Sequence, residues 1–428
     1  MFTAHPQREA LHNEVHARPY ERLTAPLALS HIALVGSEAE RAREHIVTLL
    51  RNRHLPLPAD DANHLSVDLG GVHLRWEKHT EFHTCTFWKA LREPPDSFDA
   101  PALDDVPQEW LNAMPGQWLV GLHMLVRGGR GPDSGPAVQQ LVRRGFQEES
   151  LVGSSAMDGD ADVYTDLQLA PDGFARVLLI ADGMSPRRLG RAVQRLLEVE
   201  TYRMMALLGL PMAREVGAAL LHAERDLAHV AGQIRSAQRH EEPELLRQLT
   251  QLAGQVESLY ARTHARFSAS SAYFELVQRR IEELRERRLE NLQTLGEFMD
   301  RRLAPAMQTC VWAARRQQAL SERISRTSNL LRTRVEIEQQ QSSQELLDAM
   351  NRRQRAQMLL QSAVEGLSVA AVTYYGAGLV GYAAKGAKAA GWPVHPDLAV
   401  AFAIPVIGLA VWWGIRRLHR QVQADVER

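Results

Sequence analysis

The feature that most constrains this chain is a pair of apolar segments near its C-terminus. Residues 367–384 (LSVAAVTYYGAGLVGYAA) and 398–415 (LAVAFAIPVIGLAVWWGI) each run for about 18 residues without a charged side chain. At a rise of about 1.5 Å per residue, each segment nearly spans a hydrocarbon core about 30 Å thick. We therefore expect residues 364–428 to form a two-helix transmembrane hairpin with a basic tail.

The charges around these segments predict their orientation. Arginines cluster before the first segment and after the second, at Arg352, Arg353, Arg355, Arg416, Arg417 and Arg420. The connecting loop carries only Lys385 and Lys388 against Asp397. Because basic residues favour the cytoplasmic side, both termini should lie inside a bacterial inner membrane. The aromatic residues agree, with Trp412 and Trp413 at the inner boundary and Tyr382 and Trp392 near the outer one.

Residues 1–210 have the mixed pattern of a cytoplasmic α+β domain. A helix is expected at residues 38–52, and a second helix should begin at Pro186 and run to Gly209. Gly70 and Gly71 separate two alternating segments, which predicts a hairpin. Strands are expected at 29–35, 64–69, 72–79, 82–88, 118–126 and 175–182. These elements should form one sheet with helices packed on it.

Residues 211–363 form a long-helical, coiled-coil-like region. Gly and Pro become rare, and apolar residues recur at helical spacing in two stripes: Leu292, Leu295, Met299 and Leu303, then Leu320, Ile324 and Leu331. Pro243 and Pro305 are expected to break the helices. The last helix, at about 342–361, has no breaker before the first apolar segment, so it should continue directly into the membrane.

The overall charge and the cysteines exclude several classes of protein. Acidic and basic residues nearly cancel, 51 against 50, so the charge balance does not indicate a nucleic-acid-binding protein. Two distant cysteines fit a reducing cytoplasm better than a disulfide scaffold. Residues 1–18 contain no apolar run, so they do not form a secretory signal. The expected partners are the lipid bilayer, further copies of this chain and a protein partner, and no cofactor is expected.

The HNEVH sequence near the N-terminus resembles the zinc-binding helices of hydrolases in spacing only. His12 and His16 are four residues apart, but Glu14 lies midway between them and projects to the opposite face. We therefore expect no metal, although Glu14, His16 and Arg18 remain candidate functional residues.

Three other patterns suggest sites that fit a structural role better. His83 and Cys85 should share a strand face, which makes packing more probable than a thiolate-imidazole site. Asp158, Asp160 and Asp162 begin like a calcium loop but lack its glycine and its final glutamate, which favours a solvated turn. The Gly-rich run at 127–135 lacks both phosphate-binding spacings, and no clear helix is expected to open after it.

The first apolar segment supplies the remaining candidates. Glu365 lies at its inner edge, and Tyr374, Tyr375 and Gly376 lie within it. Its many small residues include Ala377 and Gly381, whose spacing lets two helix backbones approach closely. Pro405 should kink the second segment.

Three stretches of the sequence carry a resemblance to a known family. They are HPQREALHNEVHARP (5–19), LLEVETYRMMALLGLPMAR (196–214) and EGLSVAAVTYYGAGLVGYAAKG (365–386). They resemble an uncharacterised bacterial family described as predicted membrane-anchored proteins, the domain of unknown function 3422. The string NEVHARP is the most distinctive part. The resemblance covers essentially the whole chain and implies membrane anchoring, and the family has no established activity.

The order of the parts is also similar to that of CorA-type magnesium channels. Those channels carry Gly-Met-Asn at the outer end of the first span, whereas this chain has Tyr374 to Gly378 and then Gly381 to Gly386 there. Our leading hypothesis is a non-enzymatic, self-associating scaffold or sensor, and the alternative is an oligomeric ion channel or transporter. An enzyme that uses His12, Glu14, His16 and Arg18 is a third hypothesis.

Overall fold

The chain divides into two compact units. The computed structural model describes all residues except 1, 3, 15–18, 37–38, 61, 130–134, 392 and 427–428, and it leaves the side chains of 10, 13–14, 39 and 418–426 undescribed. The first unit comprises Met1–Ala237 and Glu244–Ser328, and the second comprises Gln238–Pro243 and Asn329–Arg428.

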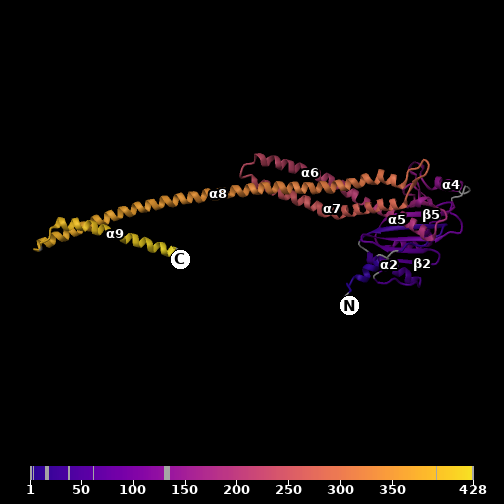
Figure 1. The fold of residues 1–428 in the computed structure, drawn as a ribbon, viewed down its shortest axis with the longest axis horizontal. Helices are drawn as coiled ribbons and strands as arrows, with labels where there is room; N and C mark the ends of the chain where they lie inside the picture. The colour runs from indigo at the N-terminus through magenta and orange to yellow at the C-terminus, as the bar shows by residue number, and fades with distance from the viewer. Residues whose placement is uncertain are drawn as a thin grey trace. The chain divides into compact units, whose positions relative to one another are not determined.

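A mixed sheet forms the centre of the first unit (Figure 1). In the described part of the chain it has nine strands in the order β2-β3-β4-β1-β5-β8-β7-β6-β9. The strands are β1 (Leu27–Val35), β2 (His64–Asp68), β3 (His73–Lys78), β4 (Phe82–Ala90), β5 (Gln117–Gly128), β6 (Val152–Ala156), β7 (Ala161–Thr165), β8 (Ala175–Ala181) and β9 (Arg287–Arg288). All neighbours pair antiparallel except β5 and β8, which are parallel. The predicted hairpin and strands are confirmed.

The register places alternate residues of neighbouring strands on the same face. On β1, His31 pairs with Thr86 of β4 and with Leu122 of β5. On β3, Arg75 pairs with Thr86, and Glu77 pairs with Thr84. Since side chains alternate along a strand, these residues share one face, and Trp76, Cys85 and Phe87 share the other.

Helices cover both faces of the sheet. On one face, α2 (Ala39–Asn52) buries Ile46, Leu49 and Leu50 against β1, β3 and β4, and α4 (Gly135–Gly145) buries Leu141 beside β5 and β8. On the other face, α5 (Pro186–Leu207) packs Leu189, Val193 and Leu196 against the sheet. The prediction that no helix follows the Gly-rich run is wrong, because α4 begins at Gly135. Its proline is the second residue, where a missing N–H costs nothing.

Small elements complete the N-terminal half. They are α1 (Arg8–Glu14), α3 (Gln108–Asn112) and three short 3₁₀ helices, η1 (Ala102–Asp105), η2 (Glu148–Ser150) and η3 (Met157–Gly159). The η3 turn carries Asp158 and Asp160, which pair with arginines. Asp158 accepts from Arg285 at 2.9 Å, and Asp160 pairs with Arg188. The predicted turn is therefore present at Asp158 in η3 and at Asp160 directly after it, where ion pairs hold it, whereas Asp162 lies on β7.

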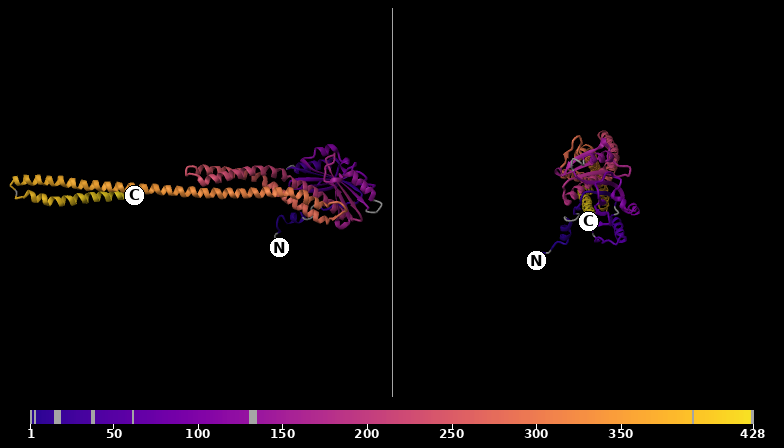
Figure 2. Two further views of the ribbon diagram at one scale, coloured as in Figure 1. Left: turned by 90° about the horizontal axis from the view of Figure 1, so that it is seen from above. Right: turned by 90° about the vertical axis from the view of Figure 1, so that its right-hand side faces the viewer.

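Long helices extend from α5. They are α6 (Gly209–Ser236), α7 (Glu242–Leu284) and α8 (Leu295–Ala389), and the first part of α8 runs beside α6 and α7 (Figures 1 and 2). Leu295, Met299 and Leu303 are buried, as their stripe predicted. Pro243 lies in the first turn of α7, but the break predicted at Pro305 is wrong. Pro305 is exposed, so water can satisfy the carbonyl group that the proline leaves without a donor.

The end of α8 and α9 (Pro396–Val426) form an antiparallel pair in the second unit (Figure 2). A Cβ placed on Gly376 would lie 3.2 Å from Ile407, and one placed on Gly381 would lie 3.0 Å from Val400. Ala377 is also buried. The small residues therefore let the two helices pack closely, and the predicted continuity of α8 is confirmed.

Three helical stretches of the described chain are long and apolar enough to cross a membrane, judged by length and composition. They are Pro186–Ser236, Leu295–Ala389 and Pro396–Arg417. The first contains α5, whose apolar side chains already pack on the sheet. The other two contain the segments that the sequence predicted to span.

Candidate functional site

Polar side chains gather on the sheet face that α5 covers. The face is apolar on β5 and β8, where Leu122, Met124 and Leu179 are buried. On β1, β3 and β4 the same face instead carries His31, Arg75, Glu77, Thr84 and Thr86. Burying a polar group costs free energy unless it is hydrogen-bonded, so this group of residues requires partners.

A cavity of about 240 Å³ lies at this polar part of the face. Its walls come from β1, β3 and β4, from the segment at residues 21–23, from α5 and from Arg280 of α7. The segment crosses α5 closely, because a Cβ on Gly190 would meet the carbonyl oxygen of Glu21 at 1.8 Å. Only glycine allows this approach, which closes one side of the cavity.

His31 organises two hydroxyl groups in the cavity wall. Its Nδ1 lies 2.8 Å from Thr86 Oγ1, and its Nε2 lies 3.0 Å from Thr201 Oγ1 of α5. Burial lowers the pKa of His31 to about 4; the charge of Glu77 opposes this shift, and His79 and Arg75 add to it. The imidazole is therefore neutral at pH 7 and links the sheet to α5.

Arg75 forms a second polar group. Its Nη2 donates to Glu77 Oε1 at 2.9 Å, and its Nη1 lies 3.9 Å from Glu21 Oε1. Nη1 also donates to the carbonyl oxygen of Pro19 at 3.0 Å. Pro19 ends the NEVHARP string, so the described end of that motif is held at the cavity.

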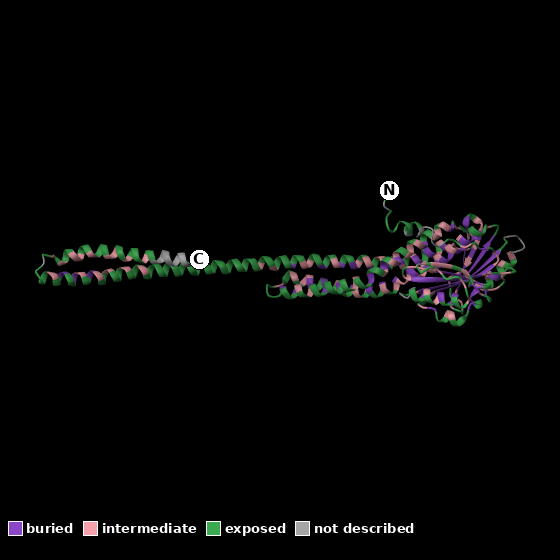
Figure 3. Cartoon of the chain, turned by 90° about the horizontal axis from the view of Figure 1, so that it is seen from below, coloured by how far each residue is buried: buried purple, intermediate pink, exposed green. Residues whose placement is uncertain are grey.

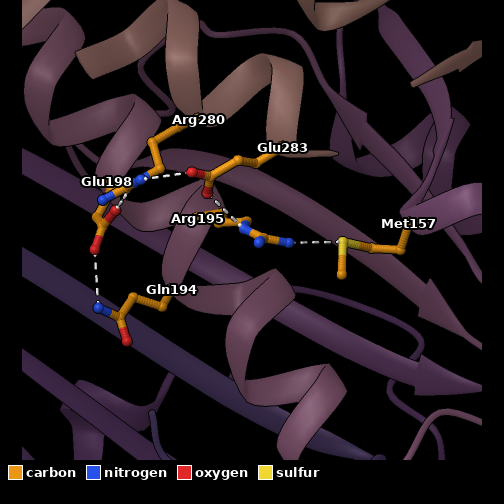
Figure 4. Close-up of polar contacts among 6 residues, drawn as sticks. All are labelled: Met157, Gln194, Arg195, Glu198, Arg280 and Glu283. Atoms are coloured by element: carbon orange, nitrogen blue, oxygen red, sulfur yellow. Dashed lines mark hydrogen bonds and ion pairs between the residues drawn. The ribbon is translucent and has the colours of Figure 1, made fainter. Parts of the chain in front are cut away.

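Figure 4 shows a third group, which joins α5 to α7. Glu198 accepts from Gln194 Nε2 at 2.8 Å and from Arg280 Nε. Arg280 Nη1 donates to Glu283 at 3.0 Å, and Arg195 Nε donates to the other oxygen of Glu283 at 3.0 Å. Although burial lowers the pKa of Arg280, the two carboxylates raise it overall, so this guanidinium stays charged.

Two buried polar atoms at the cavity have no hydrogen-bond partner among the residues that the structure describes. They are Thr84 Oγ1 and Gln194 Oε1. Thr84 is only 3% exposed, and both residues line the cavity. Because most buried polar side-chain atoms are hydrogen-bonded, these two atoms leave hydrogen-bonding capacity in the cavity that a ligand or a water molecule can use.

The comparison with family models decides which family this chain is related to. The model described as "Protein of unknown function (DUF3422)" matches residues 3–422. The chain belongs to this family. The resemblance seen in the sequence is therefore confirmed, and it covers nearly the whole DUF3422 protein. No curated protein and no solved structure matches the chain.

Most of the functional candidates identified from the sequence near the N-terminus of this DUF3422 protein lie outside the residues that the structure describes. His16 and Arg18 are outside the described residues, and so is the side chain of Glu14. In the described part of the chain, no group of three or more His, Cys, Asp or Glu residues could hold a metal ion. The roles of these three residues stay predictions.

His83 and Cys85 share a face of β4, as expected, and it is the face opposite the cavity. Cys85 Sγ lies 3.9 Å from Met114 Sδ, and burial raises the pKa of the thiol. Burial also lowers the pKa of His83 to about 4, and the charge of His45 adds to this effect. Both side chains are buried, so the predicted packing role fits His83 and Cys85.

The candidates of the first apolar segment lie in the second compact unit of the DUF3422 protein. Tyr374 and Tyr375 are 76% and 71% exposed, and Gly376 packs against Ile407 of α9. Glu365 is partly buried on α8. The cavity residues belong to the first unit, and the sequence predicted no site that joins them, although the family stretch at 196–214 contains Glu198, Thr201 and Tyr202. Alternation on β3 and β4 was the available signal, because Arg75, Glu77, Thr84 and Thr86 occupy inward positions.

Proposed function

We propose that this DUF3422 protein is a membrane-anchored sensor. Its α/β domain binds a small polar ligand in the cavity beneath α5, and its C-terminal hairpin holds the domain at the cytoplasmic face of a bacterial inner membrane. The observation that carries the proposal is the pair of buried, unpartnered atoms, Thr84 Oγ1 and Gln194 Oε1, in one cavity. These two atoms can form hydrogen bonds with a ligand, because no group of the described protein does so.

The state of the cavity residues favours binding over catalysis. Both ring nitrogens of His31 contact threonine hydroxyls, and the ring is neutral. Glu77 and Glu198 each accept hydrogen bonds from arginine. A general base or nucleophile needs a group free to take a proton or attack, and these groups are engaged.

The cavity residues also connect the ligand site to the contact between α5 and α7. Gln194 and Glu198 lie on α5, and Glu198 holds Arg280 of α7 (Figure 4). A ligand that bonds to Gln194 or Glu198 competes with these contacts and so biases the packing of α5 on α7. α5 is followed directly by α6, and α7 precedes α8 in the chain, so a change in this packing acts on the long helices, which supports a sensor.

The chemistry of the C-terminal helices supports the anchor. Large apolar side chains on α8 and α9 point away from the protein, including Leu367, Leu379, Phe402 and Leu409. At the end of the second segment, Arg416 lies 4.6 Å from the ring of Trp412, and Arg417 lies 5.4 Å from that of Trp413. Arginine paired with tryptophan suits the headgroup layer at the cytoplasmic surface.

Thiol labelling in whole cells tests the anchor and its orientation. Cys85 and Cys310 are 0% and 2% exposed, so the native thiols give little background. We expect Ala390→Cys, at the end of α8 next to the loop, to react with a membrane-impermeant maleimide in spheroplasts. Ser343→Cys, on the exposed part of α8, should react only after lysis. Labelling of Ser343→Cys in intact spheroplasts, or recovery of the protein in the soluble fraction, would contradict the proposal.

Ligand binding is tested by the matched variant Thr84→Val. The substitution keeps the shape of the side chain and removes only the unpartnered hydroxyl. We expect a metabolite panel to raise the melting temperature of the detergent-purified protein, and Thr84→Val to weaken the binding of the hit about tenfold. The stability of the Thr84→Val variant without ligand should be unchanged or higher, because the substitution removes a buried hydroxyl that has no hydrogen-bond partner. A panel without hits, or full binding by Thr84→Val, would contradict a ligand site here.

The exposed tyrosines of α8 favour one second candidate function, an oligomeric channel. Tyr374 and Tyr375 project from the first apolar segment, where copies of the chain could meet. Flux through liposomes that hold the protein tests this function. A channel predicts flux that Glu365→Ala and Tyr375→Ala alter, whereas a sensor predicts none.

A further inference from the structure

We propose that the cavity binds a small organic cation, a short aliphatic compound with a primary ammonium group. The proposal rests on the binding function given above and names the class of its ligand. Three independent properties of the cavity lead to it: its charge, its free hydrogen-bonding atoms and its apolar wall.

The described residues of the cavity wall carry an excess of negative charge. Its wall contains the carboxylates of Glu21, Glu77 and Glu198 against the guanidinium groups of Arg75 and Arg280. His31 adds no charge at neutral pH. The next layer, Glu283 with Arg195, is balanced and leaves the excess unchanged. These carboxylates are partly shielded from water, with side-chain exposures of 26% for Glu21, 13% for Glu77 and 20% for Glu198. The excess negative charge therefore favours a ligand with one positive charge over an anion.

The unpartnered atoms of the cavity favour a ligand that donates hydrogen bonds. The amide orientation of Gln194 is fixed, because its nitrogen donates to Glu198, which as a carboxylate can only accept. The unpartnered Oε1 of Gln194 is therefore an acceptor. The hydroxyl of Thr84 can accept as well as donate. An ammonium group has three N–H donors and can serve Gln194 Oε1 together with a carboxylate.

The rest of the wall suits a short alkyl chain. Phe82, Trp88 and Tyr202 place aromatic rings around the cavity, and Leu29 and Leu197 add aliphatic surface. Aromatic faces attract a nearby cation, which adds to the preference for ammonium. The volume of about 240 Å³ lies below the roughly 300–1,000 Å³ of most ligand pockets, so the ligand must be small.

A series of three compounds of equal length separates charge from shape. 4-Amino-1-butanol carries an ammonium group at one end, 1,4-butanediol carries a hydroxyl in its place, and 4-hydroxybutyrate carries a carboxylate. Calorimetric titration of the full-length protein in detergent should show saturable binding of the amine. We expect binding of the diol to be at least tenfold weaker, and we expect no heat from the anion.

Two glutamate variants test which carboxylates bind the ammonium group. Glu198→Gln and Glu77→Gln each remove one negative charge at nearly constant shape, so each should reduce the amine-to-diol affinity ratio at least threefold. The ratio, unlike either affinity alone, is insensitive to a general loosening of the fold. Glu244→Gln is the matched control, because this exposed glutamate of α7 pairs with Arg247 away from the cavity. It should leave the ratio unchanged.

The outcomes separate the ligand class from the binding function. Equal or tighter binding of the diol or the anion, or an unchanged ratio in both cavity variants, overturns the ammonium ligand. If the metabolite panel then still yields a hit that Thr84→Val weakens, the sensor function stands with a different ligand. If neither the series nor the panel yields binding, both proposals fail.

Discussion

Burial keeps three histidines of the α/β domain neutral, and this makes the fold sensitive to acid. His31, His83 and His123 each have a pKa lowered to about 4, and burial is the main cause in each case. In the unfolded chain a histidine takes up its proton near pH 6.5. The unfolded chain therefore binds more protons between these values, and the fold loses stability as the pH falls from about 6.5 to 4.

We expect each of these histidines to contribute a loss of roughly 3 kcal/mol across that range. Urea unfolding of the purified protein, followed at several pH values, measures the slope. His31→Gln should lower stability at pH 7 because it disturbs Thr86 and Thr201, and it should also make the slope shallower. His229→Gln on the exposed face of α6 is the control and should keep the slope. A wild-type protein equally stable at pH 4.5 and pH 7 would contradict this account.

At the scale of elements, the crossing of residues 21–23 over α5 depends on one glycine. A Cβ on Gly190 would lie 1.8 Å from the carbonyl oxygen of Glu21, which belongs to the backbone and cannot rotate away. We expect Gly190→Ala to cost about 3 kcal/mol and to open the cavity wall. Thermal unfolding measures the loss. We also expect Gly190→Ala to weaken the binding of any cavity ligand, because Glu21 and Leu23 line the cavity.

The matched control for this substitution should change the free energy of unfolding in the opposite direction. Gly217 lies inside α6, and a Cβ there would meet nothing within 4 Å. Gly217→Ala should therefore stabilise the protein by about 0.5–1 kcal/mol, the helix-propensity difference between the two residues. Equal effects of the two substitutions would show that the residue 21–23 segment does not press on α5.

Alternation and helical spacing predicted most elements, but they could not predict which faces meet. The strands at Leu29, Phe82 and Trp118 were identified from local pattern, whereas the position of β1 between β4 and β5 depends on pairing between distant residues. The cavity arises from that order, because it brings His31 beside Thr86. Pro305 misled the prediction for a similar reason: whether a proline breaks a helix depends on the solvent exposure of the preceding turn.

At the scale of the whole molecule, the part of α8 before the first apolar segment is exposed along its length. Every residue from 339 to 364 is exposed in the single chain (Figure 3). Most of the stability of a helix in a protein comes from packing of its apolar face, and this stretch has no such packing within the described chain. Leu346, Met350, Leu360 and Val364 lie on one face of it, with Arg353 and Gln357 between the two apolar pairs. If the C-terminal hairpin anchors copies in one membrane, as proposed, the copies share an orientation, and we expect this face to meet the same face of another copy in a parallel coiled coil.

We therefore expect the wild-type protein to be oligomeric in mild detergent, as measured by light scattering with the detergent mass subtracted. The double variant Leu346→Gln/Leu360→Gln should shift it toward the monomer, because both substitutions place amides in the shared apolar face. Met358→Gln is the control, since Met358 is equally exposed but lies about 120° around the helix from Leu346. A monomeric wild type, or a control as disruptive as the double variant, would mean that another partner covers this helix. The proposed ligand binding beneath α5 does not require self-association and would be tested separately.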